Sequence, residues 1–174
     1  MRNIIQISFI LDLDNNEKYY GGIYNIETNE FYYSLNNLCN VSSIEFTQFD
    51  NMFLYVQNDS LNRPFKIKSH IISTNYNEDK TLLEETDPQI YIETNPTKDN
   101  KYIIVNSMSK NDSQISLINL SEADLTPTII FKREKGVKYF VEHCEVDFHL
   151  NRIISTFYQT MIIKKSLLIS NFTV

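Results

Sequence analysis

With 174 residues, the chain is long enough for one domain with its own hydrophobic core. The composition is 42% hydrophobic and 22% charged, which is ordinary for a globular protein. A net charge of -6 excludes a basic nucleic-acid surface, and only 3 glycines are present, which argues against a glycine-rich phosphate loop.

The cellular location is predicted from the cysteines and the terminus. Cys39 and Cys144 are too few for a disulfide framework, so we interpret them as reduced thiols. The N-terminus has no signal-peptide pattern. The apolar stretch 161–169 contains Lys164 and Lys165 and is too short to cross a bilayer. These features predict a cytoplasmic protein without membrane or nucleic-acid partners.

Short β-strands separated by polar turns are predicted along most of the chain, because Ile, Val, Tyr, Phe and Thr gather between turn residues. The first group of predicted strands covers 3–13, 19–26 and 30–35. The second group covers 43–48, 52–57, 64–72 and 80–85. The third group covers 89–93, 101–107, 114–120 and 128–133, and a last strand is predicted at 138–149.

The strand groups form a repeat. The segment that starts at Asp50-Asn51 matches the segment that starts at Asp99-Asn100 in residue type at six of seven positions, 49 residues further on. One period earlier, Asn3 again starts a strand. The Asp-Asn pair suits a tight turn, because short polar side chains cap their own backbone and tolerate left-handed conformations.

A period near 50 with four strands per repeat is typical of propeller blades. We therefore predict an all-β fold, an incomplete β-propeller of antiparallel four-stranded blades. The predicted blades are 43–85 and 88–133, with a partial blade at 1–35 and the start of another at 137–149. Residues 150–174 form an unmatched C-terminal tail. Two full blades and two partial ones do not close a ring, so the chain is interpreted as a fragment of a propeller.

Four motifs in a fixed order resemble the propeller of the prolyl oligopeptidase family, in its oligopeptidase B or protease II branch. They are Arg63-Pro64 with His70, the acidic stretch 79–87, the strand 101–107, and Tyr139 to His143 followed by Asp147-Phe148. The resemblance covers roughly 7–148. The chain departs from it at Ser113-Gln114, where the family has Ser-Glu, and after Phe148.

The resemblance implies a propeller that covers a separate α/β-hydrolase domain with a Ser-Asp-His triad and admits short peptides cut after Arg or Lys. Such chemistry needs a G-x-S-x-G turn, and Gly21, Gly22 and Gly136 each lack a serine two residues away. We therefore expect no catalytic residue, no cofactor and no metal in this chain. The implied partners are the catalytic domain and the peptide substrates.

Two other functions remain open at this point. A stand-alone interaction module would capture a protein partner through exposed strand edges. A lactonase-type propeller would need a calcium site of clustered acidic and amide side chains, which the sequence does not assemble.

One candidate metal site lies on the predicted strand 138–149. His143, Glu145, Asp147 and His149 share one face of that strand, with Cys144 between them. Six residues of strand span about 20 Å, too far for the coordination shell of one ion. We favour a polar strand face over a metal site.

The remaining candidates also have structural explanations that we favour. His70 near Glu84, Glu85 and Asp87 is interpreted as a histidine paired with a carboxylate rather than part of an acidic peptide-binding patch. Arg63-Pro64 is interpreted as a turn element. A cluster of tyrosines without basic neighbours is expected to pack in the core rather than to stack on nucleic acid. It comprises Tyr19, Tyr20, Tyr24, Tyr32 and Tyr33.

Overall fold

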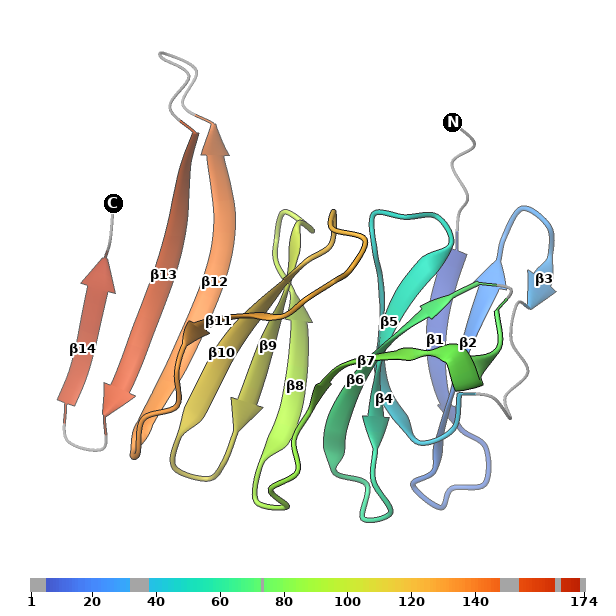
Figure 1. The fold of residues 1–174 in the computed structure, drawn as a ribbon, viewed down its shortest axis with the longest axis horizontal. Coiled ribbons are helices and arrows are strands. Elements are labelled where there is room, and N and C mark those ends of the chain that lie inside the picture. The colour runs from blue at the N-terminus through green and yellow to red at the C-terminus, as the bar shows by residue number, and fades with distance from the viewer. Residues whose placement is uncertain (1–5, 32–37, 73, 148–153, 165–166, 173–174) are drawn as a thin grey trace. The chain divides into compact units, whose positions relative to one another are not determined.

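The computed structural model describes residues 6–31, 38–72, 74–147, 154–164 and 167–172, with side chains described as far as His143. The chain forms two compact units, Met1–Thr86 and Asp87–Val174, which are treated separately below. Within the described residues, every regular element is a β-strand except one short 3-10 turn, and all strand pairs are antiparallel (Figure 1). The all-β prediction is therefore confirmed.

The first unit contains two sheets. The three-stranded sheet has the order β1-β2-β3, and the four-stranded sheet has the order β4-β5-β6-β7 (Figure 1). The strands of the first sheet are β1 (Gln6–Asp12), β2 (Tyr19–Asn25) and β3 (Glu30–Phe31). Those of the second are β4 (Val41–Phe46), β5 (Met52–Asn58), β6 (Pro64–Ile71) and β7 (Lys80–Glu84), with the 3-10 turn η1 (Tyr76–Glu78) between β6 and β7.

A shared hydrophobic core joins these two sheets. Ile23 of β2 packs with Ile44, Phe53 and Tyr55 of the four-stranded sheet, and each is less than a tenth exposed. Gly21 makes the close approach possible, because an added Cβ would lie 2.7 Å from Ile44 Cδ1. A side chain at this position of β2 would therefore force the neighbouring core side chains to move.

The second unit repeats the four-stranded sheet and adds a three-stranded one. The orders are β11-β10-β9-β8 and β12-β13-β14. The first sheet contains β8 (Tyr91–Pro96), β9 (Tyr102–Met108), β10 (Ser113–Asn119) and β11 (Thr128–Phe131). The second contains β12 (Val137–Asp147), β13 (Ile154–Lys164) and β14 (Leu167–Phe172).

The start of β12 docks on the face of the β8–β11 sheet. Tyr139 N donates a buried hydrogen bond of 2.9 Å to Ser113 Oγ, and the Tyr139 ring stacks on Phe131 at 5.1 Å. Val137 and Tyr139 share a core with Ile104, Ile115 and Leu117. β12 is thus attached through both a hydrogen bond and apolar burial.

The turn between the first and second strands has the same hydrogen bonds in both four-stranded sheets. Thr47 Oγ1 donates to Met52 O at 2.9 Å, and Thr97 Oγ1 donates to Tyr102 O at 3.1 Å. These equivalent pairs are 50 residues apart, one more than the sequence repeat, so Asn100 stands where the earlier turn has Asp50. Asn100 adopts the left-handed conformation, with φ of 54°, that the sequence favours for an Asp-Asn turn.

The strands agree closely with the sequence predictions within the described residues. The ends of three predicted strands lie outside them: residues 3–5 of strand 3–13, residues 32–35 of strand 30–35 and residues 148–149 of strand 138–149. The structure adds η1, β13 and β14, which the sequence did not indicate. The exact blade boundaries remain a prediction.

Candidate functional site

A buried histidine–aspartate pair lies within the β4–β7 sheet. His70 is at the end of β6, and its Nδ1 lies 2.6 Å from Asp79 Oδ1, which directly precedes β7. The two side chains are 0% and 1% exposed. The Tyr76 ring of η1 stacks on the His70 ring at 4.0 Å. The pair therefore fastens the turn between β6 and β7 to the sheet.

Asp79 also binds a second partner. Tyr55 Oη of β5 donates to Asp79 Oδ2 at 2.6 Å. Burial, followed by the hydrogen bond to the Asp79 carboxylate, raises the pKa of Tyr55 above its ordinary value. Asp79 thus connects β5 and β6 with the start of β7. The cluster is sealed from solvent, so it serves to hold strands together and offers no surface to a substrate.

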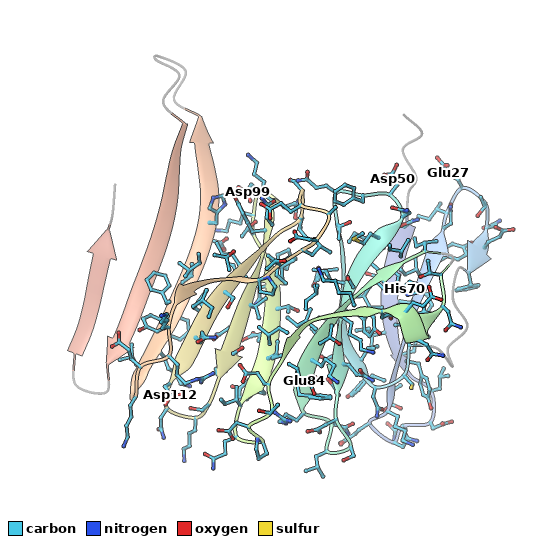
Figure 2. All side chains as sticks on the ribbon, in the orientation of Figure 1. Glu27, Asp50, His70, Glu84, Asp99 and Asp112 are labelled. Atoms are coloured by element: carbon cyan, nitrogen blue, oxygen red, sulfur yellow. The ribbon has the colours of Figure 1, made fainter. Side chains whose placement is uncertain are left out.

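The acidic residues predicted near His70 lie elsewhere. Glu84 is at the far end of β7, where it pairs with Lys66 Nζ at 3.2 Å, and Figure 2 shows it well separated from His70. The Glu85 carbonyl accepts a hydrogen bond from Arg63, and the Asp87 carboxylate caps the Gln89 amide. The partner of His70 is thus Asp79, as the structural interpretation of this histidine requires, and not one of the three acids named from sequence.

An arginine clamp occurs in both four-stranded sheets. Arg63 Nε lies 2.8 Å from Asp59 Oδ2, and its Nη1 donates to Glu85 O, which follows β7. In the second unit, Arg133 follows β11 and donates to Asp112 Oδ1 and Ser107 O, each at 3.0 Å. Each clamp ties the turn between the second and third strands to the outermost strand. Arg63 therefore has the structural role of a turn element.

A second histidine–aspartate pair lies in the second unit. His143 Nδ1 of β12 lies 2.9 Å from Asp99 Oδ2, in the turn between β8 and β9. Burial pushes the pKa of Asp99 up, but hydrogen bonds from Thr97 and Lys101 and the nearby His143 outweigh it, so that pKa is lowered. The pair joins β12 to the neighbouring sheet.

The candidate metal site lies mostly outside the residues whose side chains are described. His143 belongs to the pair with Asp99, whereas the side chains of Cys144, Glu145 and Asp147, and all of His149, lie outside the described part of the chain. Among the residues whose side chains are described, no group of three His, Cys, Asp or Glu is placed to hold a metal ion.

The tyrosines of the first unit lie at different depths. Tyr24 packs against Phe31 at 4.9 Å on one face of the three-stranded sheet, while Tyr19 is 38% exposed. Tyr20 is half-buried, and Tyr32 and Tyr33 lie outside the described residues. The three described tyrosines are thus partly or largely exposed, and the core packing expected from the sequence is not found for them.

A pocket of about 530 Å³ lies in the second unit, between the β8–β11 sheet and β12. We call it the β12 pocket. Its polar lining residues are Glu93, Asn95, Asn106, Ser113, Lys138 and Glu142. Its apolar lining residues are Pro96, Ile104, Met108, Ile115, Tyr139, Phe140 and Val141. The volume is in the range of small-molecule sites.

Sequence reasoning did not identify Asp79 and Asp99 as the histidine partners, nor the β12 pocket. Their positions in the chain were the one available signal. Asp79 directly precedes β7, and Asp99 lies in the short turn between β8 and β9. The pocket had no local signal, since its lining comes from β8, β9, β10 and β12 together.

None of the described helical segments is long and apolar enough to cross a membrane.

Comparison with known proteins places the chain among propellers. Residues 6–164 match the family described as prolyl oligopeptidase, N-terminal β-propeller domain. Protease 2 from Moraxella lacunata is 25% identical over 144 residues, which are 82% of this chain and 21% of that protein. The matched range extends past Phe148, where the motif resemblance ended.

Solved structures show the same fold. Oligopeptidase B from Leishmania major matches 97% of this chain with a TM-score of 0.72 at 19% identity. The β-propeller domain of the trilobed protease from Pyrococcus furiosus matches 96% with a TM-score of 0.54 at 10% identity. The chain spans 25% of the oligopeptidase B chain and 54% of the Pyrococcus chain. The predicted fold, an incomplete β-propeller, is confirmed.

Proposed function

Because the chain belongs to the prolyl oligopeptidase family through its N-terminal β-propeller domain, we propose that it is part of the substrate-gating propeller of an oligopeptidase B-like serine peptidase. The proposal assigns catalysis to a separate α/β-hydrolase domain. The propeller shields that domain and limits its substrates to short peptides.

The observation that carries this proposal is the family match over 6–164, which includes strands of both units. The match to Protease 2 supports the oligopeptidase B branch. The buried environments of His70 and His143 support a non-catalytic role, because each ring is paired with an aspartate inside the fold and is 3% exposed or less.

We further propose that the substrates are short basic peptides and that the protein acts in the cytoplasm. The net charge of -6 is compatible with basic peptides, since opposite charge favours their encounter. Cys39 is an exposed free thiol, which suits a reducing compartment.

A peptidase assay tests the proposal. The purified chain is expected to leave short Arg- and Lys-containing peptides intact, and the gene region downstream of Val174 is expected to encode a G-x-S-x-G motif. Cleavage of these peptides by the chain alone, blocked by a serine-reactive inhibitor, would contradict a non-catalytic role.

One observation favours the alternative of a protein-interaction module. Ile7, Leu11 and Phe31 of the three-stranded sheet are 48%, 42% and 67% exposed, and a group of exposed apolar side chains on one sheet is a candidate contact surface for a partner. A stable, monodisperse monomer that unfolds cooperatively without a partner would favour this module. Aggregation of the isolated chain, by contrast, favours part of a larger propeller.

A further inference from the structure

β12 makes polar contacts with the β8–β11 sheet at two separated points, and the β12 pocket lies along this part of the strand. At one point Tyr139 N binds Ser113 Oγ, and at the other His143 Nδ1 meets Asp99 Oδ2. Ser113 begins β10, whereas Asp99 lies in the turn after β8. β12 therefore crosses the sheet obliquely. Its apolar side chains cover part of the sheet face, and the part that β12 leaves uncovered lines the pocket.

Two of the hydrogen-bond acceptors that line the pocket are neighbours on the sheet face. Glu93 of β8 and Asn106 of β9 are directly opposite each other in the antiparallel ladder, so their side chains are neighbours on one face. Asn106 Oδ1 is buried and accepts no hydrogen bond from the described residues. Among the described residues, its amide nitrogen makes a long contact of 4.0 Å with Met108 Sδ. A buried acceptor without a donor is costly, and a ligand that supplies a donor removes that cost.

The charges around the pocket favour a cationic donor. Glu93 and Glu142 line it, and Lys138 is the one basic lining residue among the side chains that the structure describes. Lys138 lies close enough to Asp112, in the β9–β10 turn, for its positive charge to help lower the pKa of that carboxyl, after burial and the bonds from Arg133 and Ser109. The two carboxylates outnumber this cation, so the described lining of the pocket carries a net negative charge.

We propose that the β12 pocket binds a primary ammonium group carried on a short aliphatic stem. An ammonium ion has three donors and no acceptor, which matches the Asn106 oxygen and the Glu93 carboxylate. Ile104, Ile115 and Met108 supply apolar surface for the stem. The pocket rests on the geometry of the second unit and is independent of the proposed peptidase role.

Titration of the full-length chain with pentylammonium chloride, followed by nuclear magnetic resonance, tests this site. Signals of the Asn106 side-chain amide and of neighbouring β8 and β9 amides are expected to shift with saturation. Pentan-1-ol, which has the same stem without the charge, and equimolar sodium chloride are expected to leave them unchanged. Equal shifts with the alcohol, or no shifts with the amine, would overturn the proposal.

Two variants sharpen the test. Glu93→Gln keeps the shape of an exposed side chain and removes its charge, so affinity for pentylammonium is expected to fall about tenfold. Asn106→Leu removes the buried acceptor. If the Asn106→Leu variant does not fold, the affinity of Glu93→Gln for pentylammonium tests the site by itself. Glu27→Gln is the matched control, since Glu27 is an exposed carboxylate of the first unit (Figure 2). Wild-type affinity in Glu93→Gln would sink the assignment.

The natural source of the ammonium group is distinguished by two further ligands. N-acetyl-lysine methylamide offers only a side-chain ammonium, and alanyl-alanine amide offers only a peptide N-terminus. Binding of the first alone identifies a lysine side chain, and binding of the second alone identifies a peptide end. Binding of neither, while pentylammonium binds, identifies a free amine.

Discussion

The two four-stranded sheets share the same construction but use their histidine–aspartate pairs differently. Both have a threonine-stabilised first turn and an arginine clamp at the outer strand. In the β4–β7 sheet, His70 and Asp79 belong to the same sheet. In the second unit, Asp99 belongs to the β8–β11 sheet and His143 to the next one.

This difference distinguishes contacts that stabilise a single sheet from a contact that joins neighbouring sheets. The turn and the clamp recur because every sheet must close its hairpins. A buried histidine–aspartate pair instead occurs at one particular connection, either the turn from β6 to β7 or the docking of β12. The pairs also differ in burial, because Asp79 is 1% exposed and Asp99 is 16% exposed.

The largest effect is expected from Asp79→Ala. This change leaves both the Tyr55 hydroxyl and His70 buried without their carboxylate partner, so the first unit is expected to lose about 3–5 kcal/mol of unfolding free energy. Urea denaturation followed by tyrosine fluorescence measures the loss. The control is Glu78→Ala, one residue earlier and exposed, which is expected to change stability by less than about 0.5 kcal/mol. Similar stability of the two variants would contradict the role of Asp79.

A smaller effect is expected from His143→Ala in the second unit. Because Asp99 remains partly solvated, the loss is expected to be about 1–3 kcal/mol. Hydrogen exchange of β12 is expected to accelerate while exchange of β9 is unchanged. Phe140→Ala is the control on the same strand, where the side chain is 47% exposed. Equal acceleration in both strands would show that the pair supports the whole sheet instead.

The two arginine clamps are expected to contribute equally, because they make equivalent connections. Arg63→Ala and Arg133→Ala are each expected to cost about 1 kcal/mol, since the clamps are partly exposed. A lysine at either position restores little, because its single ammonium does not reproduce the planar fork that reaches two acceptors. Lys132→Ala, at an exposed neighbour, is the control. A twofold larger loss at one site would break the equivalence of the clamps.

The smallest effect is a pH dependence at Asp112. Burial raises the pKa of Asp112, but the hydrogen bonds from Arg133 and Ser109 lower this pKa by more than burial raises it. The net shift of the pKa is therefore downward. A depressed folded pKa stabilises the fold above the ordinary value near 3.8, and this contribution is lost as pH falls through the folded pKa. The stability gap between wild type and Asp112→Asn is therefore expected to be constant from about pH 7 to 5 and to shrink below about pH 4. An unchanged gap at about pH 2 would contradict this linkage.

The strands could be predicted from sequence because their signals are local. Alternating apolar residues and polar turns indicate strands such as β5 and β9, and the repeated turn beside Asp50 and Asp99 indicates a blade period. The period predicted from the sequence was one residue too short. Residue identity aligns Asp50 with Asp99, whereas the hydrogen bonds of the two turns align Asp50 with Asn100. A hydrogen-bond register depends on the turn geometry, which residue identity alone does not fix.

The partners of the two histidines could not be predicted, for a different reason. Nearness in sequence pointed from His70 to Glu84 and Glu85, but β7 runs antiparallel to β6, so its start and not its end lies beside His70. His143 meets a residue 44 positions earlier because β12 crosses a neighbouring sheet. The oblique crossing of β12, along which the β12 pocket lies, is likewise a property of packing between sheets.

Residue-resolved hydrogen exchange on His70→Ala and His143→Ala tests the central contrast most directly. The account predicts that His70→Ala exposes η1 and β7 to exchange, while His143→Ala exposes β12 around position 143 and leaves all four strands β8–β11 protected. Uniform loss of protection across the β8–β11 sheet in His143→Ala, or intact protection of β7 in His70→Ala, would contradict it.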